Sequence, residues 1–170
     1  SAPASWFQNA MVTPGKRLRA VTYPGAPEAG HAWAYLPDLA ETIARLAAIE
    51  PRLAPFERVH FAGHYLPRGI AMAEAVARAS GDPDLPIRRF PWPLVRLAAP
   101  VVPLFREIVE MRYLWRHAIR LDNRRLVALI GAEPHTPLDD AVRASLAALG
   151  CLAPEKAAQV SLSPGYSQAG

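Results

Sequence analysis

The sequence predicts a helix-rich α/β fold with an incomplete sheet. Four short segments alternate apolar and polar residues, as half-buried strands do, at 18–23, 31–36, 58–63 and 85–90. Between and after them, apolar residues recur every three or four positions, which is typical of helices that bury one face. Strands and helices therefore alternate at first and are followed by several helices. The strands are too few for a complete doubly wound sheet.

The segment 31–46 changes its periodicity at Pro37. Before this proline, His31, Trp33 and Tyr35 can share one face of an extended strand. Pro37 disfavours helical backbone at the residue before it, so a helix is expected to begin only after it. The segment therefore predicts a strand that brings three polar-tipped rings to one face, which would make a suitable pocket wall.

Three polar residues are predicted to cap helices. Asp38 stands where the N-cap of a helix running to 46 belongs, and Glu41, three residues later, completes a pair similar to a capping box. Asp122 and Thr136 are predicted to cap the last two helices in the same way. The stripe of the first helix that is expected to face the core comprises Leu39, Ile43 and Leu46.

The stretch 94–115 is apolar and helical in pattern, but Pro100 and Pro103 predict a kink or two separate helices. Its longest uncharged apolar run, 97–105, has nine residues, whereas a membrane-spanning helix needs about 20. A helix lying on a membrane surface over 94–120 ranks last among the hypotheses, because its positive residues do not segregate from its apolar ones.

Composition favours a folded chain and argues against several partner classes. Hydrophobic residues make up 51% of the 170 residues and charged residues 20%, so one domain with a packed core is expected over 1–152. The stretch 153–170 is expected to be a disordered tail. The net charge of +4 is mild and its cations are scattered, which disfavours nucleic-acid binding. A single cysteine and the absence of a signal-peptide pattern favour a cytoplasmic location.

The candidate site residues are rings near the ends of predicted strands. Two interpretations stand for His31, Trp33 and Tyr35: they contact a small-molecule ligand, or they form the amphipathic edge of a half-buried strand. His64 and Tyr65 follow the next predicted strand, in a loop position from which side chains often reach ligands. No metal site is expected, because no His or Cys spacing favours one.

The sequence lacks the common catalytic and cofactor motifs. It contains no G-x-G-x-x-G, no G-x-x-x-x-G-K-[ST], no H-E-x-x-H and no G-x-S-x-G. None of its tyrosines is followed by Lys at the fourth position, so the Tyr-x-x-x-Lys pair of short-chain dehydrogenases is absent too. We therefore expect no catalytic residue within this chain.

Three stretches, at 31–40, 59–63 and 122–139, resemble the C-terminal part of an extended short-chain dehydrogenase/reductase, the NAD-dependent epimerase/dehydratase family. The first, His-Ala-Trp-Ala-Tyr-Leu-Pro-Asp-Leu-Ala, is similar to the family's strand that runs into a helix. The second is a strand that ends in Gly, and the third is similar to the family's closing segment. Together they span most of the chain before the predicted tail.

This resemblance implies the C-terminal portion of a Rossmann-type NAD(P)-binding fold, which is the substrate-binding half of an oxidoreductase. The Gly-rich loop and the Tyr-x-x-x-Lys pair of such enzymes belong to an N-terminal half, so this chain would be inactive without that half. NAD or NADP would serve the parent enzyme, and neither would be held by this chain alone. His31 stands where the family's nucleotide-sugar enzymes have an Arg that contacts the diphosphate, so a smaller or less anionic substrate is expected.

Two kinds of partner are expected for such a half-enzyme. The missing N-terminal half or a second copy of the chain would dock through the apolar stretch 94–115. No nucleic-acid or membrane partner is expected. The alternative is a free-standing, non-catalytic ligand-binding or protein-interaction module, which should unfold cooperatively by itself, whereas half of an enzyme should expose apolar surface and bind dyes.

Overall fold

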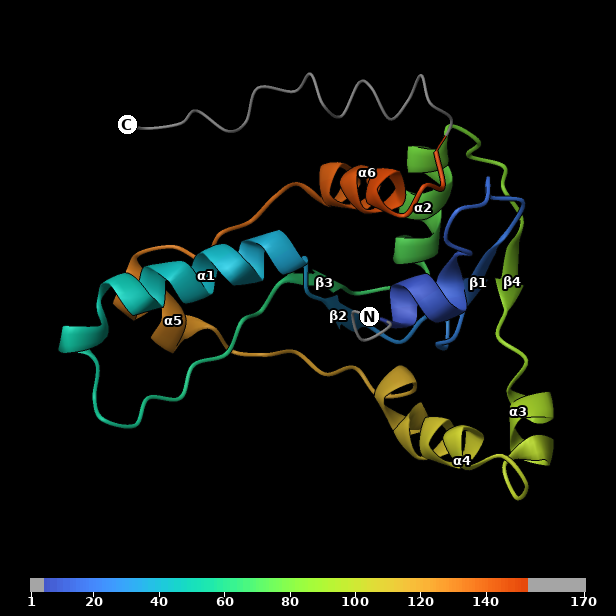
Figure 1. Cartoon of the computed structure of the whole chain (residues 1–170), viewed down its shortest axis with the longest axis horizontal. Coiled ribbons are helices and arrows are strands. Elements are labelled where there is room, and N and C mark those ends of the chain that lie inside the picture. The colour runs from blue at the N-terminus through green and yellow to red at the C-terminus, as the bar shows by residue number, and fades with distance from the viewer. Residues whose placement is uncertain (1–4, 153–170) are drawn as a thin grey trace. The chain divides into compact units, whose positions relative to one another are not determined.

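The computed structural model describes residues 5–152, and these form two compact units. Unit 1 takes its described residues from 1–24, 72–90 and 139–170, and unit 2 consists of 25–71 and 91–138. Each unit is therefore assembled from segments that are far apart in the sequence, as the colours in Figure 1 show. The predicted tail 153–170 lies outside the described residues.

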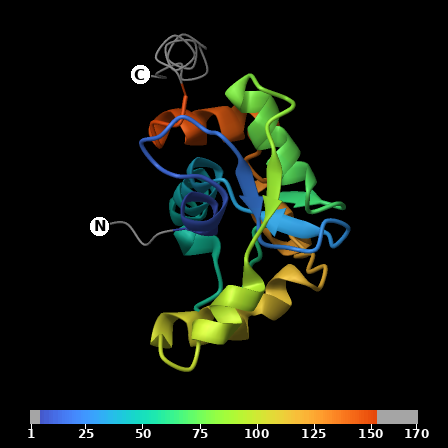
Figure 2. The same ribbon diagram turned by 90° about the vertical axis from the view of Figure 1, so that its right-hand side faces the viewer.

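Unit 1 contains a parallel pair of short strands. Strand β1 (Val21–Tyr23) pairs with β4 (Ile87–Arg89), with Val21 opposite Ile87, and the two strands lie side by side in both ribbon views (Figure 1, Figure 2). A parallel pair needs a long crossover connection, and helix α2 (Ala71–Ser80) is part of the chain between them. The remaining elements are the π-helical turn η1 (Phe7–Met11) and helix α6 (Leu138–Ala148).

The best-buried side chains of unit 1 come from β1, α2 and α6. Val21, Val76 and Leu146, one from each element, are fully inaccessible to solvent. Val142 is buried as well, so Val142 and Leu146, one turn apart on α6, both face the core. Most of the buried face of α2 is alanine, which lets the helix approach its neighbours closely.

Unit 2 contains an antiparallel strand pair and a series of helices. Strand β2 (His31–Trp33) pairs with β3 (His64–Leu66). Helix α1 (Leu36–Ala48) follows β2 almost directly. The later elements are η2 (Glu50–Arg52), α3 (Trp92–Ala98), α4 (Pro103–Glu110), η3 (Met111–Trp115) and α5 (Arg124–Ile130). Helices α1 and α5 contact each other, as do α3 and α4.

The described residues thus form a helix-rich structure of α/β character, with one parallel and one antiparallel strand pair. This confirms the coarse fold class predicted from the alternation of strands and helices. The break predicted at the two prolines is confirmed, since α3 ends at Ala98 and α4 begins at Pro103. Within 5–152, no helix combines the length and the apolar character that crossing a membrane requires.

The strand predicted over 58–63 is wrong, because the residues that pair come next in the sequence. Strand β3 begins at His64, and the backbone N–H groups of Ala62 and Gly63 donate to the carboxylate of Glu133. His64 and Tyr65 therefore lie in a strand and not in the predicted loop. A carboxylate that is remote in sequence takes the donors before β3, which no local alternation of residues could reveal.

The start and the buried face of α1 also differ from the prediction. Tyr35 is the N-cap residue and the helix begins at Leu36, so the N-cap assignment of Asp38 is wrong. Asp38 and Thr42 are the buried residues of this helix, whereas Ile43, predicted to face the core, is 59% exposed. The helix turns its polar edge inward because the Asp38 carboxylate is hydrogen-bonded within unit 2, as described below.

The other two predicted caps lie just before their helices. Asn123 is the N-cap residue of α5, and Asp122 precedes it and accepts a hydrogen bond of 3.0 Å from the Arg124 backbone N–H. Helix α6 begins at Leu138, two residues after Thr136. Both predictions therefore miss the N-cap position by one residue, although Asp122 still binds a first-turn N–H group.

Candidate ligand-binding site on the paired strands

Strands β2 and β3 distribute the predicted site residues over two faces of a small sheet. Trp33 lies opposite His64, and Ala32 lies opposite Tyr65. Successive side chains of a strand alternate and directly opposite residues share a face, so His31, Trp33 and His64 lie on one face. Tyr65 lies on the other face. The strand pairing therefore brings three of the five predicted residues together, His31, Trp33 and His64. It places Tyr65 on the opposite face.

Two glycines allow the chain to approach itself around these strands. Gly63 has a φ of +60°, and a Cβ atom there would overlap the carbonyl oxygen of Trp33. A Cβ atom at Gly30 would overlap the hydroxyl oxygen of Tyr65. Gly63 therefore needs glycine both for its backbone conformation and for lack of space against backbone, whereas a side chain at Gly30 would displace the Tyr65 side chain.

Three rings from two elements pack together on the first face. The imidazole of His31 stacks on the indole of Trp115, with ring centroids 4.2 Å apart and ring planes within 11°. Trp33 packs edge-on against His31 at 5.1 Å and lies 5.7 Å from Trp115. Trp115 belongs to η3, which the backbone N–H of Ala26 holds through a hydrogen bond of 3.1 Å to the Trp115 carbonyl. These rings form a continuous aromatic surface beside β2.

Trp115 is the site residue that the sequence did not indicate. It lies within an arginine-rich stretch, 112–120, whose spacing is typical of an exposed helix face. In the structure this stretch begins as a 3₁₀ turn and Trp115 is buried. No local pattern predicts that this turn folds back onto a strand some eighty residues earlier in the chain.

His31 is held as a neutral ring in this cluster. Burial lowers its pKa from the ordinary value of 6.5, and a hydrogen bond to the Leu114 backbone opposes part of that effect. A neutral imidazole stacks on indole without the desolvation cost that a charged ring would carry. His31 therefore contributes an aromatic surface and not a cation.

His64 is the most enclosed polar group of the site. Its side chain is only 7% exposed, and its Nε2 atom has no hydrogen-bond partner in the part of the chain that the structure describes. Its ring centroid lies 4.3 Å from that of His135. Burial and the charge of His135 lower the pKa of His64, while the charges of Asp38 and Glu133 raise it. Buried polar atoms are normally hydrogen-bonded, so a nitrogen without a partner among the described residues is unusual.

The two carboxylates near His64 are already occupied by donors. Asp38 accepts hydrogen bonds from the backbone N–H of Thr136 at 2.8 Å and from its hydroxyl at 2.7 Å. Glu133 accepts from the two backbone N–H groups before β3, at 2.9 and 2.8 Å, and from Asn123 Nδ2 at 2.9 Å. Both carboxylates therefore anchor the segment 133–136 against α1 and β3, and Thr136 is a tether more than a cap.

Tyr65 lies on the other face of the sheet, and Tyr35 lies beyond the end of β2. Burial raises the pKa of the Tyr35 hydroxyl, and the Asp38 charge adds to the effect, so the tyrosine at the N-cap of α1 stays protonated. On the opposite face of the sheet, the guanidinium of Arg120 lies 5.5 Å from the ring centroid of Tyr65. Tyr65 therefore faces away from His64, because neighbouring residues of a strand face opposite ways.

We refer to the cluster formed by His31, Trp33, Trp115, His64 and His135 as the β2–β3 site. Its rings can stack on a flat or apolar part of a ligand, and the buried His64 nitrogen can bind a hydroxyl or carbonyl group. It contains no nucleophile with an adjacent base. Across residues 5–152, no group of three or more His, Cys, Asp or Glu side chains is arranged to hold a metal ion.

A hollow of about 520 Å³ opens on the surface of unit 2 and contains none of the predicted ligand-binding residues. It is lined by Arg58, His60, Asp122, Arg124 and Arg125. Two of its cations are engaged by carboxylates, Arg124 by Asp122 at 2.6 Å and Arg125 by Glu57 at 2.7 Å. In these exposed ion pairs the carboxylates neutralise the charges of Arg124 and Arg125. The hollow is therefore a weaker candidate for ligand binding than the β2–β3 site.

The lowered histidine pKa values predict that the protein loses stability in acid. The unfolded chain binds protons at the ordinary value near 6.5, whereas His64 and His31 in the folded state bind them only at lower pH. We expect the free energy of unfolding, measured with urea, to fall as the pH is lowered from about 6.5 to about 5. His64→Gln should reduce this slope, while the exposed control His60→Gln should keep it. An unchanged slope in His64→Gln would contradict the burial of this imidazole.

Comparison of the chain with protein-family models, with curated proteins and with solved structures finds no match.

Proposed function

We propose that this chain is the substrate-binding half of an NAD(P)-dependent epimerase/dehydratase-type oxidoreductase. The observation that carries the proposal is the β2–β3 site, where stacked rings and a buried imidazole nitrogen share one face of a strand pair. The same strand, at 31–40, is where the sequence most resembles that family. An apolar wall with few polar atoms suits a small hydroxylated or carbonyl-bearing substrate.

The parallel pairing of β1 with β4 supports the Rossmann-type part of the proposal. Purely parallel sheets occur almost only in α/β proteins whose sheets are covered on both faces, and such sheets usually have about five strands. In the described part of the chain this sheet has two. Parallel strands from an N-terminal dinucleotide-binding half would extend this sheet. Their absence from this chain would explain why the sheet is incomplete, as the sequence predicts.

Exposed apolar residues on α1 support the proposal that a further structural element packs on this helix. Leu36 and Ile43 are exposed although they lie on a helix whose buried positions are polar. Soluble helices normally bury such residues against a neighbour. A second half that docks on this face of α1 would cover them.

In this proposal the N-terminal half and this chain would have different roles in catalysis. The N-terminal half would supply the Gly-rich loop, the Tyr-x-x-x-Lys pair and bound NAD or NADP, which carries the hydride. This chain would bind and orient the substrate, with His31 and Trp33 stacking on it and His64 Nε2 holding one oxygen. Neutral imidazoles bind phosphate less well than arginine does, so the proposed substrate is small and weakly anionic.

The decisive test is the coding sequence immediately upstream, followed by expression of the joined protein. The proposal expects about 130 to 180 upstream residues with a Gly-rich strand–turn–helix, the size of a dinucleotide-binding domain. The joined protein should bind NADH or NADPH, seen as enhanced nicotinamide fluorescence. An upstream region without such a motif, or a joined protein that binds neither cofactor, would refute the proposal.

A free-standing ligand-binding or interaction module is the second candidate. The fully buried side chains of Val76 and Leu146 in unit 1 and of Leu126 in unit 2 favour it, because each unit has a small core of its own. It predicts a cooperative thermal transition of this chain alone and little binding of 8-anilinonaphthalene-1-sulfonate. The half-enzyme predicts strong dye binding that disappears when the N-terminal half is joined.

A further inference from the structure

Strand β4 forms an open edge of the sheet in unit 1. This sheet has two strands, and β4 pairs with β1 on one side. No described strand or helix lies along its outer side in either ribbon view (Figure 1, Figure 2). All three residues of β4 are exposed, whereas Val21 and Tyr23 of β1 are buried. Of the two strands, β4 is therefore the one more open to a partner.

The pairing with β1 decides which backbone groups of β4 point outward. The backbone N–H of Phe90 donates to the Tyr23 carbonyl at 3.1 Å, so Phe90 turns its N–H group toward β1. Because successive residues of a strand turn their backbone groups to alternate sides, Ile87 and Arg89 point theirs away from β1. No backbone hydrogen bond joins these outward groups to another described residue. Their spacing matches the donors and acceptors of another extended peptide strand.

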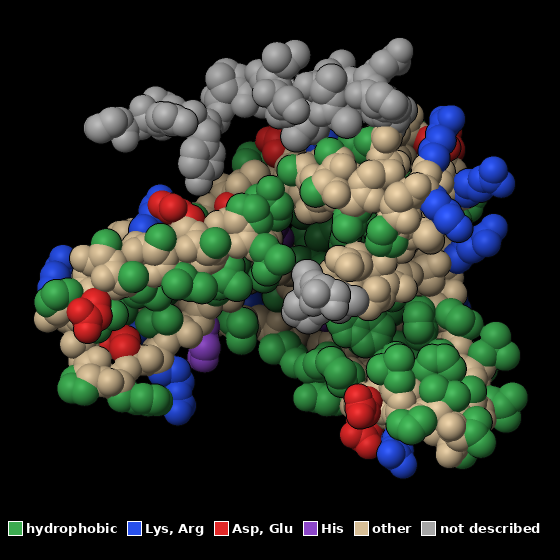
Figure 3. Space-filling model, in the orientation of Figure 1, with side chains coloured by type: hydrophobic (Ala, Val, Ile, Leu, Met, Phe, Trp, Pro, Cys, Tyr) green, Lys and Arg blue, Asp and Glu red, His purple; other side chains and the backbone are tan. Residues whose placement is uncertain are grey.

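The same pairing gathers cations that are far apart in the sequence. Arg88 and Arg89 of β4 form no ion pair with any described residue. The segment 16–19 leads into β1 and adds three exposed cations. Together, the segments 16–19 and 82–89 hold five cations and two carboxylates, a net charge of +3. Figure 3 shows Lys and Arg side chains gathered on the side of the molecule where β4 lies.

The two arginines of β4 make this edge selective. Charged side chains on an edge strand normally keep other strands away. Because side chains alternate along a strand, Arg88 projects from one face of the sheet and Arg89 from the other. Two copies of β4 would place these arginines beside one another, and like charges on paired strands destabilise the pairing. A strand with two consecutive carboxylates would instead bring one carboxylate to each arginine.

We propose that the outer edge of β4 binds an extended acidic peptide as an added strand. The peptide backbone pairs with the N–H and C=O groups of Ile87 and Arg89, and two consecutive carboxylates lie beside Arg88 and Arg89. Asp82 and Asp84 are exposed before the strand begins, so acidic residues are favoured only beside the arginines. The proposal is independent of the oxidoreductase function, because it uses no residue of the β2–β3 site and leaves the β1 edge to strands of an N-terminal half.

Titration of the full chain with short capped peptides tests the proposal, with binding read from the fluorescence anisotropy of a rhodamine label. The peptide Thr-Val-Glu-Glu-Val-Thr should bind, and Thr-Val-Lys-Lys-Val-Thr should not. Proline in place of both valines of the acidic peptide removes one N–H donor from each edge of the peptide strand and keeps its charge, so binding should be lost. Equal binding of the valine and proline peptides, or binding of neither, overturns the proposal.

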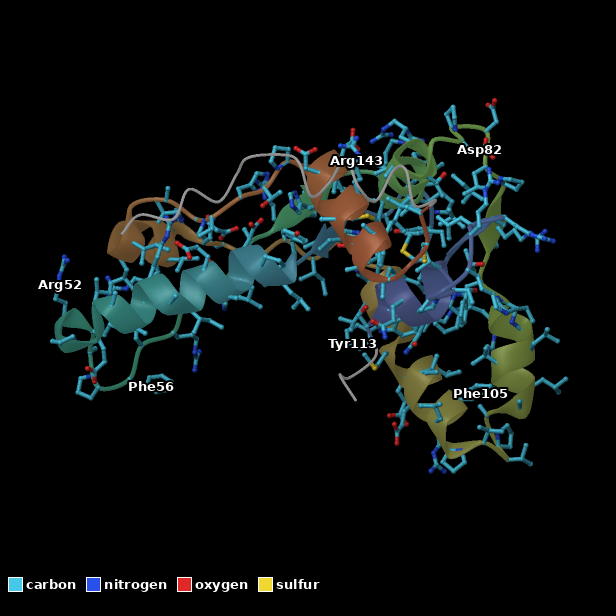
Figure 4. All side chains as sticks on the ribbon, turned by 45° about the horizontal axis from the view of Figure 1, so that its top comes forward. Arg52, Phe56, Asp82, Phe105, Tyr113 and Arg143 are labelled. Atoms are coloured by element: carbon cyan, nitrogen blue, oxygen red, sulfur yellow. The ribbon has the colours of Figure 1, made fainter. Side chains whose placement is uncertain are left out.

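The double variant Arg88→Glu and Arg89→Glu tests the role of the cations. Both side chains are exposed, so the fold should survive, and each change turns an attractive cross-strand pair into a repulsive one. Affinity for the acidic peptide should fall by about tenfold or more. Arg52→Glu with Arg143→Glu is the matched control, because it changes the net charge equally at two exposed arginines on η2 and α6, which Figure 4 labels. The control should bind the peptide nearly as the unchanged chain does, and an equal loss in both double variants overturns the proposal.

Nuclear magnetic resonance of the isotope-labelled chain shows where the acidic peptide binds. The backbone amide signals of Ile87 and Arg89 should shift during the titration, and their hydrogens should exchange more slowly with solvent. The amide of Arg88 faces β1 and should be protected already in the free chain. Shifts confined to residues outside unit 1 would place the peptide elsewhere and overturn the proposal. None of these measurements involves cofactor binding by the joined protein, so the two proposals can fail separately.

Discussion

Gly63→Ala is expected to lower the free energy of unfolding of unit 2 by about 3 kcal/mol. A residue with a side chain pays about 1 to 2 kcal/mol for the left-handed conformation that Gly63 adopts, with its φ of +60°. The added Cβ atom would also overlap the Trp33 carbonyl oxygen, which belongs to backbone and can move only if β2 and β3 separate. Overpacking of this kind costs about 1 to 3 kcal/mol more.

Gly131→Ala is the matched control for this variant. Gly131 has a φ of +84°, and a Cβ atom there would have no neighbour within 4 Å. Both variants place alanine at a positive φ and make the unfolded chain stiffer, but only Gly63→Ala meets an obstacle. We expect Gly131→Ala to lose about 1 kcal/mol. Equal losses in the two variants would show that β2 and β3 do not approach each other as described.

Urea denaturation followed by tryptophan fluorescence measures both variants. Trp33 and Trp115 belong to the β2–β3 site, so their emission reports on the region that Gly63→Ala disturbs. The disturbed packing around His31 should shift the emission of folded Gly63→Ala to longer wavelength. The emission of folded Gly131→Ala should not change, because this glycine touches neither indole.

Glu133→Gln should be the second strongly destabilising change, with a loss of about 2 kcal/mol. The Glu133 carboxylate serves three donors at once through both of its oxygens, two of them backbone N–H groups. Glutamine keeps the size of the side chain but has only one oxygen. Its NH2 group would therefore point at one of the N–H groups that now donate to Glu133, and two donors would face each other. Hydrogen bonds to a charged acceptor contribute about 1.5 to 3 kcal/mol, so the loss should be easily measured.

Glu41→Gln controls for the chemical change alone. Glu41 also holds a hydrogen bond, from Arg45 Nε at 2.7 Å, but this is an exposed pair one turn apart on α1. Such pairs contribute about 0.3 to 0.5 kcal/mol, so Glu41→Gln should be nearly neutral in the same urea experiment. A loss in Glu133→Gln as small as in Glu41→Gln would mean that the donors before β3 find another acceptor, such as water.

Both predictions concern residues whose importance the sequence did not show. Gly63 was expected to end a strand, and Glu133 had no assigned role. Glycine and glutamate are common loop residues, and nothing within a few positions of either indicates a partner that lies 30 or 70 residues away. Alternation and helical spacing report only on neighbours, so they describe elements better than contacts between elements.

The sequence by itself determined the class of this structure and several of its boundaries. Prolines 100 and 103 broke a long apolar stretch into two helices, Gly131 ended α5, and the alternating segment at 31 became β2. These features follow from local backbone chemistry: the missing N–H group of proline, the left-handed conformation open to glycine, and the two-residue period of a strand. Each of them acts within a few residues and can therefore be predicted from the chain alone.

Only the tertiary structure decided which face of each element is used. Hydrogen bonds from Thr136 turned Asp38 inward and left Ile43 exposed, and Trp115 joined His31 and Trp33 from a distant turn. In both cases the partner of a polar or aromatic side chain lies far away in the sequence. For α1, the hydrogen bonds to the buried Asp38 carboxylate stabilise the fold more than burial of Ile43 would. The β2–β3 site depends on those long-range partners, which is why its rings could be named from the sequence and its geometry could not.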